Sequence, residues 1–91
     1  KLDLFPRYPQ GFALKSGDVG FLVTAVQYIL GELERLYNFP EITISNVYDD
    51  ATATTIRDFQ RRNGIEVTGE VDRETWDALA VQHNLLLEYE E

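Results

Sequence analysis

A short motif that occurs twice constrains the fold of this chain more than any other feature of its sequence. Ser45, Asp49, Thr52 and Ile56 return as Thr68, Asp72, Thr75 and Leu79 at one constant offset, because 68 − 45, 72 − 49, 75 − 52 and 79 − 56 all equal 23. In each copy the aspartate side chain can accept a hydrogen bond from the N–H of the threonine three residues later, while the threonine hydroxyl reaches back, as in a capping box. A helix is therefore expected to begin at each copy, so the repeated residues serve the architecture.

A further helix is expected ahead of the repeat, because apolar residues recur there with helical spacing. The apolar stripe consists of Leu22, Val26, Ile29, Leu33 and Leu36, flanked by Val23, Leu30 and Tyr37. The pattern predicts a helix over residues 20–37, which Asn38 and Pro40 end because proline cannot continue the hydrogen-bond ladder. The inner faces of the two later helices are expected to carry Ala53, Ile56 and Phe59, and Trp76, Leu79, Ala80 and His83.

The connections between these helices predict extended segments. Residues 41–47 alternate apolar and polar side chains, which fits a short strand or an ordered loop, and residues 65–71 repeat this extended connection. The fold class expected is all-α, a small three-helix bundle with short extended connectors over residues 14–84. Residues 1–13 contain three aromatic side chains with proline and glycine, and predict an extended arm or interdomain linker. Residues 85–91 are expected to form an acidic tail, since three glutamates follow three consecutive leucines that lie too close together for one helical face.

Size and charge limit the classes of function. Ninety-one residues with 44% hydrophobic content suit one compact domain, which we expect to be a monomer. The net charge of −8 disfavours nucleic acid and anionic membranes, because phosphate binding depends on clustered cations. No apolar run approaches the roughly 20 residues of a membrane-spanning helix. The chain opens at Lys1 without a methionine and without a signal-peptide pattern, which suggests a processed product or a piece excised from a larger protein.

Few residues suit catalysis or metal binding. Cysteine is absent and His83 is the single histidine, so the usual zinc patterns cannot be formed. Two carboxylates could serve a glycosidase, but Asp49 and Asp72 are accounted for as helix caps. Neither Ser16 nor Ser45 lies in a nucleophile-elbow sequence. We therefore expect no enzyme activity, no metal and no cofactor.

Two features of the sequence allow alternative interpretations. Arg57 and Arg61 share a helical face and Arg62 follows, so these arginines form either a solvated face balanced by acids or a fork that holds a carboxylate or phosphate. Trp76 either anchors the core or exposes an edge on which a sugar can stack. We expect Trp76 to be mostly buried with one accessible edge.

The ordered set of motifs resembles a known family, the small three-helix peptidoglycan-binding domain of bacterial cell-wall hydrolases, spore-cortex enzymes and phage endolysins. The resemblance covers residues 14–80 and rests on Leu14, Gly17, Gly20, Val23, Val26-Gln27, Leu30, Tyr48, Thr52, Ile56, Phe59-Gln60, Gly64-Ile65, Gly69, Val71, Thr75-Trp76 and Leu79. The chain departs from the family's common pattern at Ser45-Asn46, Asp49 and Asp72, where glycine-containing turns are frequent.

The resemblance implies non-catalytic binding of peptidoglycan, which keeps an attached catalytic domain near its substrate at the bacterial wall or outside the cell. It also points to secreted multidomain proteins of Gram-positive bacteria. Sugar hydroxyls and stem-peptide carboxylates require amide, hydroxyl, arginine and aromatic partners. The residues that offer these groups, and that we predict to bind the ligand, are Tyr48, Arg57, Gln60, Arg73 and Trp76. Gln27 and Gln60 are also candidates for bonding the backbone of the turns.

A second class of function is a protein-interaction module, in which the aromatic arm, the leucines of residues 85–87 and the acidic surface dock a neighbouring domain or chain. Propeptides of metalloproteases share the fold resemblance, but their inhibitory cysteine is missing from this sequence.

Overall fold

α-Helices form the frame of the structure, a computed structural model that describes residues 13–90 and the side chains of residues 13–86. The helices are α1 (Phe21–Glu32), α2 (Glu34–Tyr37), α3 (Asp50–Arg62) and α4 (Arg73–Glu90). Between residues 13 and 90 no β-strand forms, and two isolated antiparallel bridges join Leu14 to Val71 and Val19 to Val47. The predicted all-α fold with three main helices and extended connectors is confirmed.

The long helix predicted for residues 20–37 is broken at Leu33. Leu33 has φ −89° and ψ −1°, and one further turn of helix, α2, follows before Asn38 takes a left-handed conformation with φ 59°. Gly31 lies just before the break, where glycine weakens a helix by about 1 kcal/mol relative to alanine. Because α2 does not continue α1, Leu36 is 66% exposed, and its predicted place on the apolar stripe was wrong.

The two repeated motifs begin α3 and α4 as predicted. The Asp49 carboxylate accepts hydrogen bonds from the Thr52 N–H at 2.9 Å and from the Thr52 hydroxyl at 2.7 Å. Asp72 accepts the Thr75 N–H at 3.0 Å, but only the first copy adds the hydroxyl bond. Both aspartates therefore satisfy a backbone N–H group that the first turn of a helix leaves without a partner.

α4 continues to Glu90, through the residues that were expected to form a separate tail. Leu86 packs against the core from this last part of the helix, whereas Leu85 is 50% exposed. Leu86 thus lies on the inner side of α4 and Leu85 on the outer side.

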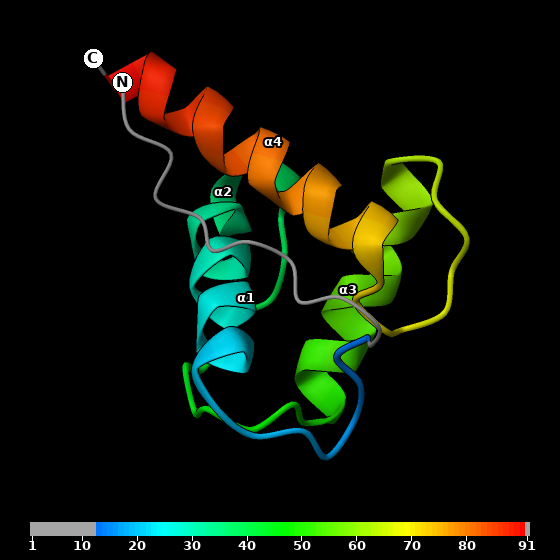
Figure 1. Ribbon diagram of the computed structural model, residues 1–91. Coiled ribbons are helices and arrows are strands. Elements are labelled where there is room, and N and C mark those ends of the chain that lie inside the picture. Colours follow the sequence, from blue (N-terminus) through cyan, green and yellow to red (C-terminus); the bar gives the residue numbers. More distant parts are fainter. Residues whose placement is uncertain (1–12, 91) are drawn as a thin grey trace.

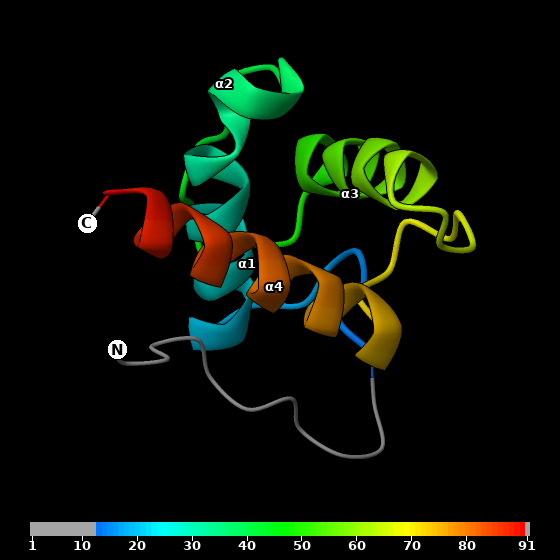
Figure 2. The ribbon, with the colours of Figure 1, turned by 90° about the horizontal axis from the view of Figure 1, so that it is seen from above.

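The core lies where α1, α3 and α4 meet. α4 crosses α1, and α3 lies beside α1, below α4 in Figure 1; Figure 2 shows the same arrangement from above. The helices contribute these fully buried apolar side chains: Val26, Leu30 and Leu33 from α1 or its end, Ile56 and Phe59 from α3, and Leu79 from α4. The inner faces predicted for α3 and for Trp76 and Leu79 of α4 are confirmed, whereas Ala80 is only partly buried.

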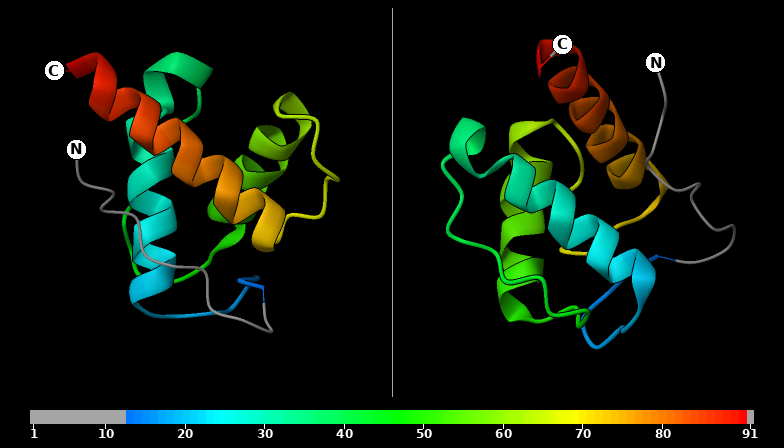
Figure 3. Two further views of the ribbon diagram at one scale, coloured as in Figure 1. Left: turned by 45° about the horizontal axis from the view of Figure 1, so that its top comes forward. Right: turned by 90° about the vertical axis from the view of Figure 1, so that its left-hand side faces the viewer.

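The connecting segments are tied together by backbone hydrogen bonds. Leu14 and Val71 exchange two bonds of 3.0 and 2.8 Å, and Tyr48 N–H donates to the Asp18 carbonyl at 2.8 Å. Residues 14–20 therefore link the turn before α3 to the turn before α4. Residues 41–47 run from α2 toward the start of α3 as an irregular segment (Figure 3), so of the two predicted alternatives the ordered loop is observed. The arm predicted for residues 1–13 lies outside the described residues, except for its last position.

Candidate binding site

Two buried glutamines hold the repeated turns in place. The Gln27 side-chain amide, wholly buried on α1, donates to the Val47 carbonyl at 2.9 Å and to the Thr52 hydroxyl at 3.0 Å. Its oxygen accepts the N–H groups of Ser45 and Asn46 at 3.0 and 3.1 Å. We call this arrangement the first glutamine clamp, because one side chain of α1 fixes the turn that begins α3.

Gln60 of α3 makes the same set of contacts with the turn that begins α4. Its amide donates to the Glu70 carbonyl at 2.8 Å and to the Thr75 hydroxyl at 3.0 Å, and its oxygen accepts the N–H groups of Thr68 and Gly69 at 2.9 and 3.0 Å. These partners follow those of Gln27 at the offset of the repeat, since 70 − 47, 75 − 52 and 68 − 45 all equal 23. The prediction that both glutamines bond the backbone of the turns is confirmed. This second glutamine clamp uses the whole hydrogen-bonding capacity of Gln60.

Three of the five predicted ligand-binding residues have buried side chains. Tyr48 is 1% exposed, Gln60 0% and Trp76 2%. The Tyr48 hydroxyl donates to the Gly69 carbonyl at 2.7 Å, and burial, with a contribution from Glu70, raises the pKa of Tyr48 far above its usual range. The accessible edge expected for Trp76 is absent. In this structure these three side chains support the turns and core beneath the surface, and a ligand outside the domain does not reach them.

The other two predicted residues, Arg57 and Arg73, are exposed and lie on different helices. Arg73 lies at the start of α4, with its Nε 3.4 Å from the carboxylate of Asp77, and both side chains are more than 60% exposed. Arg57 extends from α3 over the second repeated turn. A Cβ atom added to Gly69 would lie 2.9 Å from the Arg57 Nε, so the missing side chain of Gly69 leaves the space that the guanidinium occupies.

Arg57 also lines an open hollow of about 410 Å³, which we call the α3 depression. Its other lining residues are Pro40 from the segment after α2, and Thr54, Thr55, Asp58, Arg61 and Arg62 from α3. Sequence reasoning identified the arginines but missed Pro40 and Thr54. The spacing of Thr54, Arg57, Asp58 and Arg61, at steps of three, one and three, was the signal that they share one face of a helix.

The charged side chains of the α3 depression differ in their hydrogen-bond and salt-bridge partners. Asp58 forms salt bridges with both Arg61 and Arg62. Arg62 also donates to the Tyr37 carbonyl and lies over the Tyr37 and Phe39 rings, at 5.5 and 5.7 Å from their centroids. Arg57, by contrast, has no hydrogen-bond or salt-bridge partner anywhere in residues 13–90. Its guanidinium is the cation of this face that remains open to a ligand.

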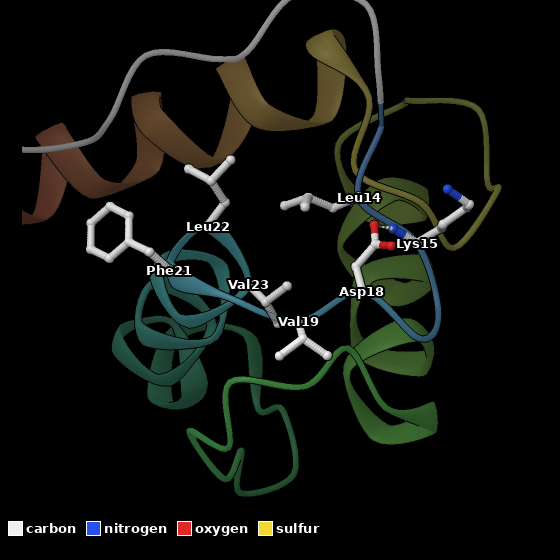
Figure 4. Close-up of a pocket in the computed structure, with 7 residues that line it drawn as sticks. All are labelled: Leu14, Lys15, Asp18, Val19, Phe21, Leu22 and Val23. Atoms are coloured by element: carbon white, nitrogen blue, oxygen red, sulfur yellow. Dashed lines mark hydrogen bonds between the residues drawn. The ribbon is translucent and has the colours of Figure 1, made fainter.

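A second open hollow, of about 390 Å³, lies beside the start of α1 (Figure 4). Val19 and Phe21 border it and are 67% and 70% exposed, and Leu14 and Leu22 form its other apolar sides. The Asp18 carboxylate accepts the N–H of Lys15 at 2.9 Å, so its charge is used to hold the turn before α1. Five of its seven lining residues are apolar, and Lys15 is its cationic group.

The search for metal and membrane sites gives little within the described residues. The side chains of residues 13–86 include no group of three or more His, Asp or Glu that could hold a metal ion. No helix in the same part of the chain is long and apolar enough to cross a membrane. His83 is 5% exposed, and its Nδ1 lies 2.8 Å from the Glu32 carboxylate, which joins α4 to the end of α1. Its position at the edge of the core is the one expected.

Comparison with known proteins assigns the family. A family model described as "Putative peptidoglycan binding domain" matches residues 23–79, which extend from α1 into α4 and include both glutamine clamps. Comparisons with curated proteins and with solved structures gave no significant match. The matched residues make up more than half of the chain, and they are the residues that form the three-helix core and the two repeated turns. The chain belongs to the peptidoglycan-binding domain family.

Proposed function

We propose that this domain is a non-catalytic module that binds peptidoglycan and holds an attached enzyme, or another part of a secreted protein, at the bacterial cell wall. The observation that carries the proposal is the family match over residues 23–79, which is continuous through the core and both turns. The proposal extends to the Gram-positive cell wall as the location, and to a covalently linked catalytic domain as the partner.

The exposed polar groups support this function. Arg57 and Thr54 line the α3 depression, so donors for hydroxyl and carboxylate groups are available at the surface, and Arg73 lies exposed beside Asp77 at the start of α4. Tyr48 and Gln60 contribute to binding by fixing the turn over which Arg57 lies, and Trp76 contributes as part of the core. Weak affinity at one site suffices for such a module, because tethering raises the effective concentration of the attached domain at its polymeric substrate.

Co-sedimentation with purified insoluble peptidoglycan tests the function. The 91-residue domain is mixed with peptidoglycan, with and without its covalently attached wall polymers, across a series of salt concentrations. We expect the domain to pellet with peptidoglycan stripped of wall polymers, with retention that falls as salt rises because exposed charges are screened. A domain that stays in the supernatant at every salt concentration, at high protein and peptidoglycan concentration, would overturn the proposal.

Docking of a neighbouring domain or chain is the second candidate function, and the outer face of α4 favours it. Val81 and Leu85 are four residues apart on this helix and are 54% and 50% exposed. Apolar side chains at such a spacing form one stripe. If docking is the function, charged substitutions at Val81 and Leu85 should release a partner protein, whereas retention on peptidoglycan should be unaffected by them.

A further inference from the structure

We propose that the α3 depression is a subsite for a single carboxylate of the peptidoglycan peptide, bound by the Arg57 guanidinium with the Thr54 hydroxyl beside it. This inference rests on the proposed function and names the chemical group that the domain recognises. Three observations carry it: how the depression is built, which of its charges are engaged, and how much positive charge it offers.

The depression exists because the two halves of the repeat differ in length. The sequence numbers of Gln27 and Gln60 differ by 60 − 27 = 33, whereas those of the turns that they hold differ by 68 − 45 = 23, so the first half is longer by 33 − 23 = 10. The additional length lies between Gln27 and Ser45, in the part of the chain that forms α2 and the segment with Pro40. Pro40 is one wall of the depression, so the additional length of the first half supplies the wall that faces α3.

The wall that carries Pro40 is firmly attached to α3. The Asn63 amide donates to the Tyr37 hydroxyl at 3.1 Å, and the Tyr37 ring packs against the Phe59 ring with centroids 5.6 Å apart. Glu34 accepts the Ile42 N–H at 2.9 Å, which closes the segment around Pro40. The wall with Pro40 is therefore set before a ligand arrives, and it loses little conformational entropy when one binds.

Arg57 is the group in this hollow that can bind an anion without losing a hydrogen bond or salt bridge. Arg61 and Arg62 share Asp58, and Arg62 is further held by Tyr37. The Arg57 guanidinium has no such partner among residues 13–90, and the Thr54 hydroxyl three residues before it likewise makes no hydrogen bond there. A guanidinium presents two parallel N–H groups that match the two oxygens of a carboxylate.

The charge balance favours one carboxylate over a polyanionic chain. The depression contains three arginines and Asp58, and two of these arginines are paired with that aspartate. The whole chain has a net charge of −8, so it repels a polymer that bears a negative charge on each repeating unit. Binding of a phosphate polymer depends on many cations that act together, and a single open arginine does not provide them.

The experiment compares soluble disaccharide–peptide fragments of peptidoglycan whose peptide carboxylates are either free or amidated. Binding to the 91-residue domain is measured by isothermal titration and by backbone NMR shifts. We expect amidation to weaken binding to the native domain about tenfold, the effect of losing one charge-assisted hydrogen-bonded pair. Arg57→Gln should weaken binding of the free-carboxylate fragment by a similar factor and should bind both fragments equally. Arg57→Lys keeps the charge without the fork and should recover only part of the affinity.

Arg35→Gln is the matched control, because Arg35 is exposed on α2 and its loss changes the net charge by the same amount. It should bind like the native domain. The subsite is overturned if Arg57→Gln binds both fragments as the native domain does, or if poly(glycerol phosphate) binds the native domain more tightly than the free-carboxylate fragment. Failure of the broader function looks different, because the native domain would then not sediment with insoluble peptidoglycan at all. Sedimentation that persists in Arg57→Gln, with no effect of amidation, would leave the function standing and remove this subsite.

Discussion

The second glutamine clamp should be a large contributor to stability, and Gln60→Leu tests this. Leucine has a similar size but cannot replace any of the hydrogen bonds of Gln60. Two of its partners are deeply buried, the Gly69 N–H and the Thr75 hydroxyl. A buried polar group that loses its partner costs about 1–3 kcal/mol, so two of them should lower the free energy of unfolding by about 2–6 kcal/mol. The Thr68 N–H and Glu70 carbonyl lie nearer the surface, where water can replace part of the loss.

The first clamp should be less sensitive, although its geometry is the same. Of the groups that Gln27 bonds, the Thr52 hydroxyl is the buried one, and it keeps a bond of 2.7 Å to Asp49 when Gln27 is removed. The Thr75 hydroxyl has no corresponding bond to Asp72 within residues 13–90. Gln27→Leu should therefore lower the free energy of unfolding by about 1–3 kcal/mol, less than Gln60→Leu.

Urea unfolding followed by the fluorescence of Trp76 measures both effects, because Trp76 is the single tryptophan and is 2% exposed when folded. The matched control is Gln82→Leu, at a partly exposed position of α4 whose side chain makes no hydrogen bond in the described part of the chain. It should change the free energy of unfolding by less than about 0.5 kcal/mol. A domain of this size is stable by about 5–14 kcal/mol, so the loss of Gln60 is a large share of the total. The reasoning is refuted if Gln60→Leu behaves like Gln82→Leu, or if Gln27→Leu costs more than Gln60→Leu.

Two further predictions concern titratable side chains. Asp49→Ala should lower the free energy of unfolding by about 0.5–2 kcal/mol at neutral pH through loss of the helix cap. The hydrogen bonds from the Thr52 hydroxyl and N–H hold the pKa of Asp49 below its usual value, so this stabilisation should be present above the pKa of the unfolded chain and disappear as the pH falls through the folded pKa. Thermal midpoints of both proteins measured from acidic to neutral pH check this, and a constant difference across that range would contradict it. Tyr48→Phe should lower the free energy of unfolding by about 0.5–1.5 kcal/mol by removing the bond to Gly69. Because burial raises the pKa of Tyr48, the native protein should also lose stability as the pH rises above about 10, where the tyrosine of the unfolded chain ionises first. The free energy of unfolding, measured with urea at each pH, should therefore fall less steeply with pH in Tyr48→Phe than in the native protein.

The helix starts could be predicted from the sequence because their causes are local. Asp49 and Asp72 each lie three residues from the threonine that they cap, and that spacing alone fixes the geometry. The stop at Asn38 is equally local, because asparagine tolerates the left-handed conformation found there. The break at Leu33 was missed, since Leu33 remains fully buried and its apolar character fits a continuous helix as well as a broken one.

The candidate site was only partly predictable, because burial depends on residues distant in the sequence. Tyr48 and Trp76 carry groups that suit a sugar ligand. The sequence predicted that Trp76 would be mostly buried, but it did not reveal that both side chains would be fully enclosed, Tyr48 with its hydroxyl on the Gly69 turn. The equivalence of the two glutamines was also concealed. The offset that aligns the turns does not align Gln27 with Gln60, because the longer first half separates the two glutamines further along the chain.

The glutamine clamps have a consequence for how this domain can vary. Each clamp closes a loop, of 45 − 27 = 18 residues for Gln27 and 68 − 60 = 8 for Gln60. Because the entropy of closing a loop grows only with the logarithm of its length, the longer first loop costs about 0.7 kcal/mol more than the second. This difference is smaller than the roughly 1–6 kcal/mol expected for the loss of either glutamine. Outside its buried residues, which are Ile29, Leu30, Leu33, Phe39 and Ile42, the segment between Gln27 and Ser45 can therefore change in length and composition at small thermodynamic cost, and new binding surfaces can be built there while the helices beneath keep their positions.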